Sequence, residues 1–511
     1  MKNINLFLIT AVLTFTTIYS QNIKSPSEFL GYELGTQFSR HNQVVDYFKH
    51  VSSEFPSKVV LEKYGESNER RPLYITYISS ENNIKNLEKI RNNNLNNAGM
   101  DGIKDDNYDS TAIVWLSYNV HGNESSSTEA AMKTLYMLVT ENSDWLENTL
   151  VILDPCINPD GRDRYANWYN QNVTYPLNTD LDAREHNEPW PGGRANHYLF
   201  DLNRDWAWLT QKESRDRIKI YNKWLPHIHV DFHEQGIDEP YYFAPAAEPL
   251  HEQITNWQRE FQIEIGDNHA KYFDKNGWLY FTKETFDLLY PSYGDTYPTF
   301  LGAIGMTYEQ AGGGDAGLGV LNSENEVVSL IDRINHHTTT GLSTVEISSI
   351  NARRLNIEFK EFFKSNNNSK ISYVLKGNKD KIKSLTNLLD QHEIIYGYSE
   401  SKNQVKGYNY SANKEIKIDI DKNDLIVSAN QPKGKLVEIL FEQKTKLSDP
   451  LTYDITAWSL PYAYGLEASV IDVKVETVSK TSNFKLNEIN SNSIGYIFEW
   501  SSLKDAEFLT S

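Results

Sequence analysis

The sequence predicts an α/β protein: a mixed central sheet with helices on both faces, followed by a smaller α+β domain toward the C-terminus. Two observations predict this order. From about residue 24 to 365, short apolar runs alternate with amphipathic helical patterns, which is typical of a sheet covered by helices on both sides. The polar stretch SNNNSK (365–370) then separates this part from a second series of short strand and helix patterns.

The elements of the first part follow in order. The β-rich run 110–120 precedes an amphipathic helix predicted over 126–141. Ser126 and Glu129 have the spacing of a capping box at the start of that helix. Three further strands that end in polar or glycine-rich turns and one closing helix are predicted, over 149–161, 224–236, 299–314 and 350–364.

The second part begins with a predicted β-α-β unit. Its strand, helix and strand are expected over 371–377, 379–391 and 393–399, with more short strands to about residue 475. Residues 476–493 resemble a linker, and the following residues begin a strand and a helix that the chain does not extend. We therefore expect four parts, a signal peptide, a main domain, an accessory domain, and a linker with the start of a truncated domain: 1–20, 21–365, 366–475 and 476–511.

The N-terminal residues predict export. Lys2 precedes the apolar stretch LFLITAVLTFTTIY, and Ser20 is a small residue before a cleavage site at Gln21. We expect a periplasmic or extracellular protein without a membrane span in its mature form, since no later apolar run is long enough. The single cysteine, Cys156, cannot form an internal disulfide. A net charge of −19 gives nucleic acid little electrostatic attraction.

Polar residues gather where the predicted strands end, which is where open α/β sheets bind ligands. His121 and Glu124 follow the first strand, and with 13 histidines in the chain about one such pair is expected by chance. An imidazole and a carboxylate suit zinc, which in catalytic sites takes three protein ligands. His233, at the end of another apolar strand, is the best third ligand. His229 shares its face but lies deeper in the sheet, in the core or behind the ligands.

A hydrolytic zinc site also needs a general base. Glu309 ends an apolar strand, and burial there would raise its pKa toward a useful value. A strand-end glutamate that simply faces solvent is the alternative for this residue taken alone.

Five motifs in order resemble the zinc carboxypeptidases of the M14 (carboxypeptidase A-like) family over residues 24 to about 345. They are HGNES (121–125), NPDGR (158–162), DLNRDW (201–206), DFHEQG (231–236) and MTYEQ (306–310). The resemblance implies one Zn²⁺ per chain held by His121, Glu124 and His233, with Glu309 as the catalytic glutamate. The chain also resembles large exported bacterial proteins of this type that have an accessory C-terminal region.

The resemblance implies further roles. Asn203 and Arg204 are similar to the pair that binds the C-terminal carboxylate of the substrate, and a guanidinium suits that group chemically. Asp201 resembles the carboxylate that orients the first zinc histidine. Arg194 is our prediction for the arginine that stabilises the oxyanion, with Arg184 as its competitor.

The tyrosine that closes over the substrate is expected within LLYPSYGDTYP (288–298), where Tyr290 is favoured over Tyr293. Gly294 and Asp295 are expected near the pocket for the last side chain of the substrate. A turn-forming role for Asp295 competes with a preference for basic side chains.

The sequence therefore predicts an exported zinc metallocarboxypeptidase that acts on peptides or proteins, as a monomer. One alternative is a zinc-dependent acyl-amide hydrolase acting on small acylated amino acids. Another is an inactive peptide-binding homologue, which would be expected to lack a ligand or Glu309. The preferred terminal residue and the role of residues 366–511 stay open.

Overall fold

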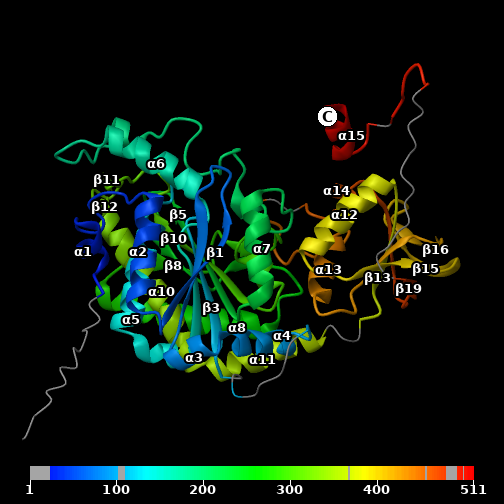
Figure 1. Cartoon of the computed structure of the whole chain (residues 1–511), viewed down its shortest axis with the longest axis horizontal. Helices are drawn as coiled ribbons and strands as arrows, with labels where there is room; N and C mark the ends of the chain where they lie inside the picture. The colour runs from blue at the N-terminus through cyan, green and yellow to red at the C-terminus, as the bar shows by residue number, and fades with distance from the viewer. Residues whose placement is uncertain are drawn as a thin grey trace, which may run out of the picture.

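The computed structural model describes residues 23–101, 107, 110–365, 369–454, 457–478, 492–498 and 500–510 (Figure 1). The predicted signal peptide, residues 1–20, lies outside the described residues, as does most of the predicted linker. The described chain forms two large sheets, one on each side of residues 366–368, and two small two-stranded pairs.

The first sheet has eight strands, and its centre is parallel. Strands β4, β3, β5 and β10 lie side by side in parallel, while β1 and β2 add an antiparallel edge. On the other side β6 pairs antiparallel with β10, and β8 pairs with β6. In spatial order the strands are β1 (Val59–Glu66), β2 (Pro72–Ile78), β4 (Thr149–Asp154), β3 (Ala112–Tyr118), β5 (Ile228–Gln235), β10 (Ile304–Ala311), β6 (Tyr241–Tyr242) and β8 (Tyr280–Phe281).

Helices cover both faces of this sheet, so its central strands are buried throughout. Along β3, Ile113 and Trp115 enter one core while Val114 and Leu116 enter the other, as the two-residue repeat of a strand requires. One face packs against α4 (Leu87–Asn97), α7 (Lys212–Trp224) and α11 (Ala352–Lys364). The other packs against α2 (His41–Glu54), α5 (Ser126–Thr140), α8 (Asn256–Asn276) and α10 (Leu330–Ile350) (Figure 1). The predicted mixed sheet with helices on both faces is confirmed.

The remaining described helices of this region are short or peripheral. They are α1 (Pro26–Leu30), α3 (Glu81–Lys85), α6 (Pro159–Asn172) and α9 (Thr296–Thr299). Small two-stranded pairs are formed by β7 (Ala247–Leu250) with β9 (Asp287–Leu288), and by β11 (Gly319–Leu321) with β12 (Val327–Ser329).

The predicted capping box at α5 is wrong. Ser125 occupies the cap position and makes no side-chain cap hydrogen bond. Ser126 instead donates from its backbone N–H and its hydroxyl to the buried carboxylate of Glu234. Glu129 turns inward, where it accepts hydrogen bonds from Ser39 and from the buried Arg162. Ser126 and Glu129 thus form hydrogen bonds with other buried groups and not the reciprocal bonds of a capping box.

The second sheet has seven strands, all paired antiparallel. In spatial order they are β16 (Lys414–Ile420), β15 (Asn403–Asn409), β18 (Glu467–Ile471), β13 (Ser372–Lys376), β17 (Leu425–Ser428), β14 (Tyr396–Ser399) and β19 (Thr477–Val478). The helices are α12 (Lys379–Gln391), α13 (Gly434–Phe441), α14 (Leu460–Ala463) and, beyond the sheet, α15 (Leu503–Thr510). The predicted β-α-β elements are present, but β17 lies between the two strands. The sheet also continues past residue 475, because β19 pairs with β14.

The two domains share one apolar core. Tyr221 and Trp224 of α7 belong to the same buried cluster as Leu385 of α12 and Leu440 of α13. His392 also bridges them, since its Nε2–H donates to the Ala207 carbonyl at 2.9 Å. The C-terminal domain therefore packs directly on the α7 side of the first sheet (Figure 1). Among the described helices, none has the length and apolar character needed to cross a membrane.

Candidate active site

Three central strands bring the predicted site residues to one edge of the first sheet. His121 follows β3, while His233 and Glu309 lie within β5 and β10 and are register partners in the parallel pairing. Parallel strands end at the same edge, so residues far apart in sequence meet there.

The loop after β3 is shaped by Asn119, which has a left-handed φ of 60°. Asparagine tolerates this conformation better than most residues. Its side-chain amide donates to the carbonyls of His121 and Glu124 at 2.8 and 3.0 Å, which holds the loop in its turn.

Glycine is needed at position 122 because another backbone lies against it. A Cβ atom there would lie 2.2 Å from the backbone nitrogen of Arg162, and one at Gly161 would lie 2.2 Å from the carbonyl oxygen of Gly193. Glycine is therefore required at position 122 by the close approach of two backbones. The NPDGR segment supports the loop from behind: Asn158 caps α6 through the Gly161 N–H and donates to the Arg194 carbonyl.

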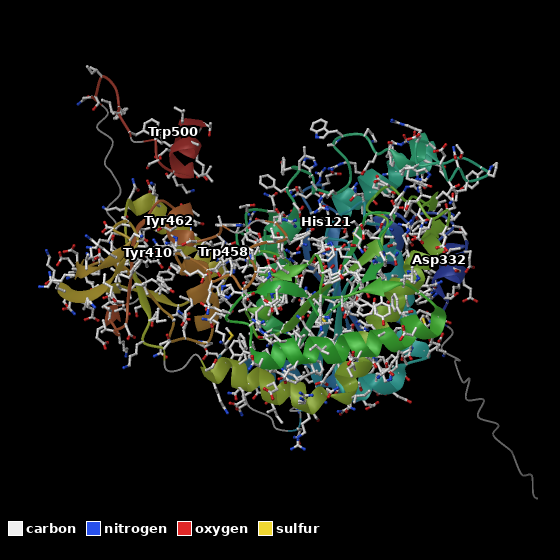
Figure 2. All side chains as sticks on the ribbon, turned by 180° about the vertical axis from the view of Figure 1, so that it is seen from behind. His121, Asp332, Tyr410, Trp458, Tyr462 and Trp500 are labelled. Atoms are coloured by element: carbon white, nitrogen blue, oxygen red, sulfur yellow. The ribbon has the colours of Figure 1, made fainter. Side chains whose placement is uncertain are left out.

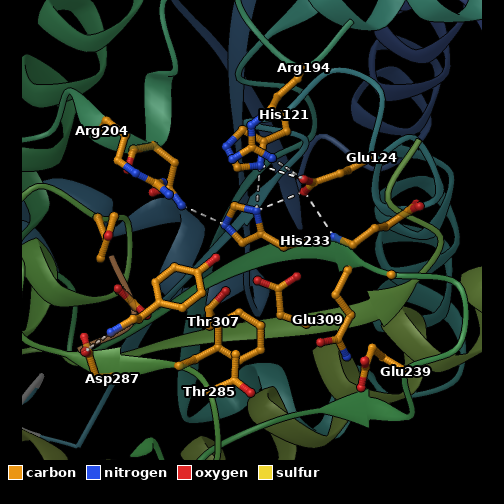
Figure 3. A pocket seen from close by; sticks show the side chains of 18 residues that line it. His121, Glu124, Arg194, Arg204, His233, Glu239, Thr285, Asp287, Thr307 and Glu309 are labelled. Atoms are coloured by element: carbon orange, nitrogen blue, oxygen red, sulfur yellow. Dashed lines mark hydrogen bonds and ion pairs between the residues drawn. The ribbon is translucent and has the colours of Figure 1, made fainter. Parts of the chain in front are cut away.

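The side chains of His121, Glu124 and His233 form a compact buried cluster (Figure 3). The two Nδ1 atoms lie 3.2 Å apart, and they lie 2.8 and 3.0 Å from the two carboxylate oxygens of Glu124. Among the described residues, this is the one group of three or more histidine, cysteine or acidic side chains close enough to share a metal ion. Although burial opposes it, the two histidines lower the pKa of Glu124, which keeps the carboxylate charged.

A carboxylate lies on the far side of each imidazole ring. His121 Nε2 lies 2.9 Å from Asp201 Oδ1, and His233 Nε2 lies 3.2 Å from Asp231 Oδ2. With the proton on Nε2, each ring would leave the Nδ1 lone pair available for a metal. The structure thus brings Asp201 to the predicted position. Asp231 was not assigned a role from sequence, although it shares a strand face with His233.

Glu309 lies in the same cavity and is 7% exposed. Burial raises its pKa to about 8, and nearby His233 opposes the rise. The predicted direction of this pKa shift is confirmed. The alternative, in which Glu309 faces solvent at the end of its strand, is wrong.

The guanidinium of Arg194 lies beside the cluster of His121, Glu124 and His233. Its Nη1 donates to Glu124 Oε1 at 3.1 Å, and its Nη2 donates to Asp201 Oδ2 at 3.0 Å. About half of the side chain is exposed, and the residue lines the cavity. Its competitor Arg184 donates instead to Asn172 Oδ1 and is absent from the cavity lining.

Asn203 and Arg204 also line the cavity. The Asn203 amide nitrogen lies 3.2 Å from His233 Nε2, and its oxygen accepts from the Gly294 N–H at 2.7 Å. The Arg204 guanidinium stacks over the ring of Tyr293, 4.5 Å from its centroid. Both predicted substrate-binding residues therefore reach the site.

Tyr290 does not reach it. The ring is buried against Tyr293 and Trp458, and the hydroxyl accepts a hydrogen bond from Trp208 Nε1 at 2.7 Å. Tyr293 lines the cavity instead. The sequence could not decide between them, because the choice depends on which ring packs beneath the C-terminal domain.

The cavity has a volume of about 330 Å³ (Figure 3). Besides the predicted residues, its lining includes several that sequence reasoning missed: Glu234, Gln235, Gly236, Glu239, Thr285, Phe286, Asp287, Thr307 and Tyr453. Most follow β5 or precede β10, and the sequence gives no signal that singles them out. Tyr453 belongs to the C-terminal domain.

Comparison with known proteins agrees with this arrangement. Residues 44–270 match the family model described as zinc carboxypeptidase, Peptidase_M14. Carboxypeptidase 2 of Trichophyton rubrum is 28% identical over 125 residues, which are 24% of this chain and 18% of that protein. The chain thus aligns with less than a fifth of the length of the curated relatives it matches.

Solved structures with a similar trace include a metallo-carboxypeptidase from Burkholderia cenocepacia, at 13% identity and a TM-score of 0.42, covering 62% of this chain and 70% of that one. Carboxypeptidase A from Helicoverpa armigera has 17% identity and a TM-score of 0.40, covering 65% and 76%. Residues 44–270, which contain both histidines and the glutamate of the buried cluster, are thus similar to the zinc carboxypeptidase family M14.

Proposed function

We propose that this protein is a zinc metallocarboxypeptidase that hydrolyses the C-terminal peptide bond of peptides or proteins. The observation that best supports this function is the cluster of His121, Glu124 and His233 in one cavity with Glu309. A closely spaced set of two imidazoles and one carboxylate is the donor set of a catalytic zinc site that leaves one position open. When bound, zinc would polarise a carbonyl oxygen and make water more acidic near neutral pH.

Glu309 is the general base in this proposal. Its carboxylate accepts a proton from the attacking water and later delivers it to the nitrogen of the departing amino acid. The buried setting of the side chain supports this role, because a carboxyl group with a raised pKa can hold the proton between the two steps.

Arg194 is positioned to stabilise negative charge on the carbonyl oxygen of the scissile bond. The guanidinium lies against Glu124 and Asp201, with part of it open to the cavity. Donors held in place before the reaction stabilise developing charge without the cost of reorganisation. Its contacts with two carboxylates keep it in position.

Arg204, with Asn203, binds the terminal carboxylate and thereby selects the last residue of the chain. A guanidinium can hold a carboxylate through two parallel hydrogen bonds, which gives orientation as well as affinity. The position of Arg204 on the cavity lining, together with Tyr293, supports this assignment.

We also propose that the protein is exported by residues 1–20 and acts as a monomer. N-terminal sequencing of the secreted protein would detect cleavage before Gln21. Sedimentation of the purified protein would reveal its oligomeric state. Recovery of uncleaved protein in the cytoplasm would contradict export.

The decisive experiment measures amino acids released from a mixed peptide library by mass spectrometry. Wild-type protein should trim peptides from the C-terminus, and a zinc chelator should abolish the trimming. Glu309→Gln should retain zinc but lower kcat by about 10²–10⁴-fold, the usual contribution of a general base. Glu361→Gln makes the same change on an exposed part of α11 and should have no effect.

Two outcomes would redirect the proposal. Zinc bound at one equivalent without any trimming would refute peptidase activity, and small acylated amino acids would then be the substrates to test. Trimming that survives both the chelator and the loss of Glu309 would refute the mechanism itself.

A further inference from the structure

A segment of the C-terminal domain reaches the catalytic cavity. We call residues 447–454 the strap. Tyr453 lines the cavity, and its backbone N–H donates to Asp287 Oδ2 at 2.8 Å. Its ring packs against Phe286, with the centroids 5.2 Å apart. The cavity wall is therefore completed by a residue from outside the region that matches the carboxypeptidase family.

The next residue of the strap, Asp454, is hydrogen-bonded to the guanidinium of Arg204. The Nε and Nη2 groups of Arg204 both donate to Asp454 Oδ2, at 3.1 and 2.8 Å. The guanidinium proposed to bind the terminal carboxylate of the substrate thus already holds an internal carboxylate. The two groups are 250 residues apart in the chain, so only the packing of the two domains brings them together.

The strap is held at both of its ends. On one side the Ser448 hydroxyl donates to Glu248 of the catalytic domain at 2.6 Å. Beyond the other end, the buried Trp458 packs with Leu289 and Tyr290 and donates from Nε1 to the Ile439 carbonyl. Figure 2 shows Trp458 where the two domains meet. A tethered carboxylate acts at a high effective concentration, which makes it a constant competitor.

The bond between Asp454 and Arg204 is nevertheless weak enough to exchange. Both hydrogen bonds end on a single oxygen of Asp454, and 38% of that side chain is exposed. Partly exposed ion pairs contribute little because water and salt compete for both charges. A substrate carboxylate that brings two oxygens to the guanidinium can replace such a contact.

We propose that Asp454 is a specificity-determining residue supplied by the C-terminal domain. It is an internal carboxylate that competes with the terminal carboxylate of the substrate for Arg204. This inference rests on the proposed carboxypeptidase function. A substrate with a free terminal carboxylate must displace Asp454, so the strap raises the KM for free-acid substrates, whereas a terminal carboxamide gains nothing from the exchange.

The first test compares Asp454→Asn with Asp449→Asn. Both variants lose one negative charge from the strap, but Asp449 accepts only from the nearby Leu451 N–H in the described contacts of its side chain. The substrates are N-acetylated dipeptides that end in Phe, Lys or Glu. Asp454→Asn should lower KM by about two- to five-fold with little change in kcat, as expected for removal of a partly exposed ion pair. Asp449→Asn should match wild type.

The sign of the KM change separates two roles. If Asp454 merely held Arg204 in position, the substitution would loosen the guanidinium and raise KM. A KM that is raised or unchanged would therefore overturn the proposal. Thermal unfolding of both variants checks that each is folded.

A binding experiment keeps this test separate from the proposed function. In the zinc-loaded Glu309→Gln background, calorimetry measures the Kd of each acetylated dipeptide and of its C-terminal carboxamide. Adding Asp454→Asn should tighten binding of the acid two- to five-fold and leave the carboxamide unchanged. If binding changes in this way but the wild-type protein shows no peptidase activity, the proposed carboxypeptidase function is refuted. The competition of Asp454 with the substrate carboxylate for Arg204 is then still supported. Acid binding that is unchanged, weaker or absent in the variant would overturn the competition.

Discussion

The two sheets of this protein differ in how they treat polar residues. The central strands of the first sheet are parallel and buried on both faces, and they end in charged residues that are themselves buried. The second sheet is antiparallel, and its outer strands β15 and β16 alternate between exposed and buried residues. Parallel strands deliver several side chains to one enclosed edge, whereas a half-solvated antiparallel sheet does not. Among the described residues, the second domain contributes only Tyr453, from a loop, to the cavity lining.

We expect the largest effect from a substitution at the enclosed edge of the first sheet. Gly122→Ala should lower kcat/KM by at least about 100-fold and reduce zinc binding. The added Cβ would lie 2.2 Å from the backbone of Arg162, so the loop with His121 must move, and a shift of about 1 Å at a catalytic site can have this effect.

Gly236→Ala is the matched control for this change. Gly236 also follows a strand at the cavity, but its added Cβ would meet only Glu239 Cγ at 3.7 Å. Wild-type kinetics in Gly122→Ala would show that the two backbones are not packed as described.

The second prediction concerns the stability of the C-terminal domain. Leu440→Ala should lower the free energy of unfolding by about 2–5 kcal/mol, because the fully buried side chain leaves a cavity in the shared core. Ile395→Ala in the same domain should change it by less than about 0.5 kcal/mol, since Ile395 is 61% exposed. Urea unfolding at neutral pH measures both. Equal effects would mean that this domain lacks the tight core of the first.

Acid should destabilise the catalytic domain more than the C-terminal domain. Burial lowers the pKa of His227, His229 and His269 to about 3, against about 6.5 in the unfolded chain. The unfolded chain therefore takes up protons first as the pH falls. The stability from these neutral histidines is complete above about pH 6.5 and is lost progressively toward pH 3. Beyond residue 365 the sequence has a single histidine, His392.

Urea midpoints between pH 7.5 and 4.5 test this difference. His269→Gln should make the midpoint less dependent on pH than it is in wild type. A steeper acid loss in His269→Gln would contradict the assignment of a buried neutral imidazole.

The smallest expected effects on stability and kinetics distinguish Tyr290 from Tyr293 at the domain junction. Tyr290→Phe removes the acceptor of the Trp208 hydrogen bond, so it should cost about 0.5–1.5 kcal/mol of stability without changing kinetics. Tyr293→Phe should lower kcat/KM by up to about ten-fold, the value of one hydrogen bond to the substrate. The reverse pattern in steady-state kinetics would restore Tyr290 as the residue that contacts the substrate.

Much of the catalytic domain was predictable because its signals are local. Apolar runs mark β3, β5 and β10 to within a few residues, and the motif spacing leads to His121, His233 and Glu309. The capping box at Ser126 failed, since the Ser126 N–H donates instead to the buried carboxyl group of Glu234 in β5. Tyr290 failed for a related reason: two nearby tyrosines have the same local pattern, and packing decides which one lines the cavity.

The sequence by itself determined the order of strands and helices, the metal-binding residue types and the expectation of a buried base. These depend on the periodicity of apolar side chains and on the chemical properties of each residue type, which do not change with its neighbours. Only the tertiary structure decided that Asp231 lies behind His233 and that Asp454 occupies Arg204. The second contact joins residues 250 positions apart, so no local pattern in the sequence indicates it, and it exists because the two domains pack together.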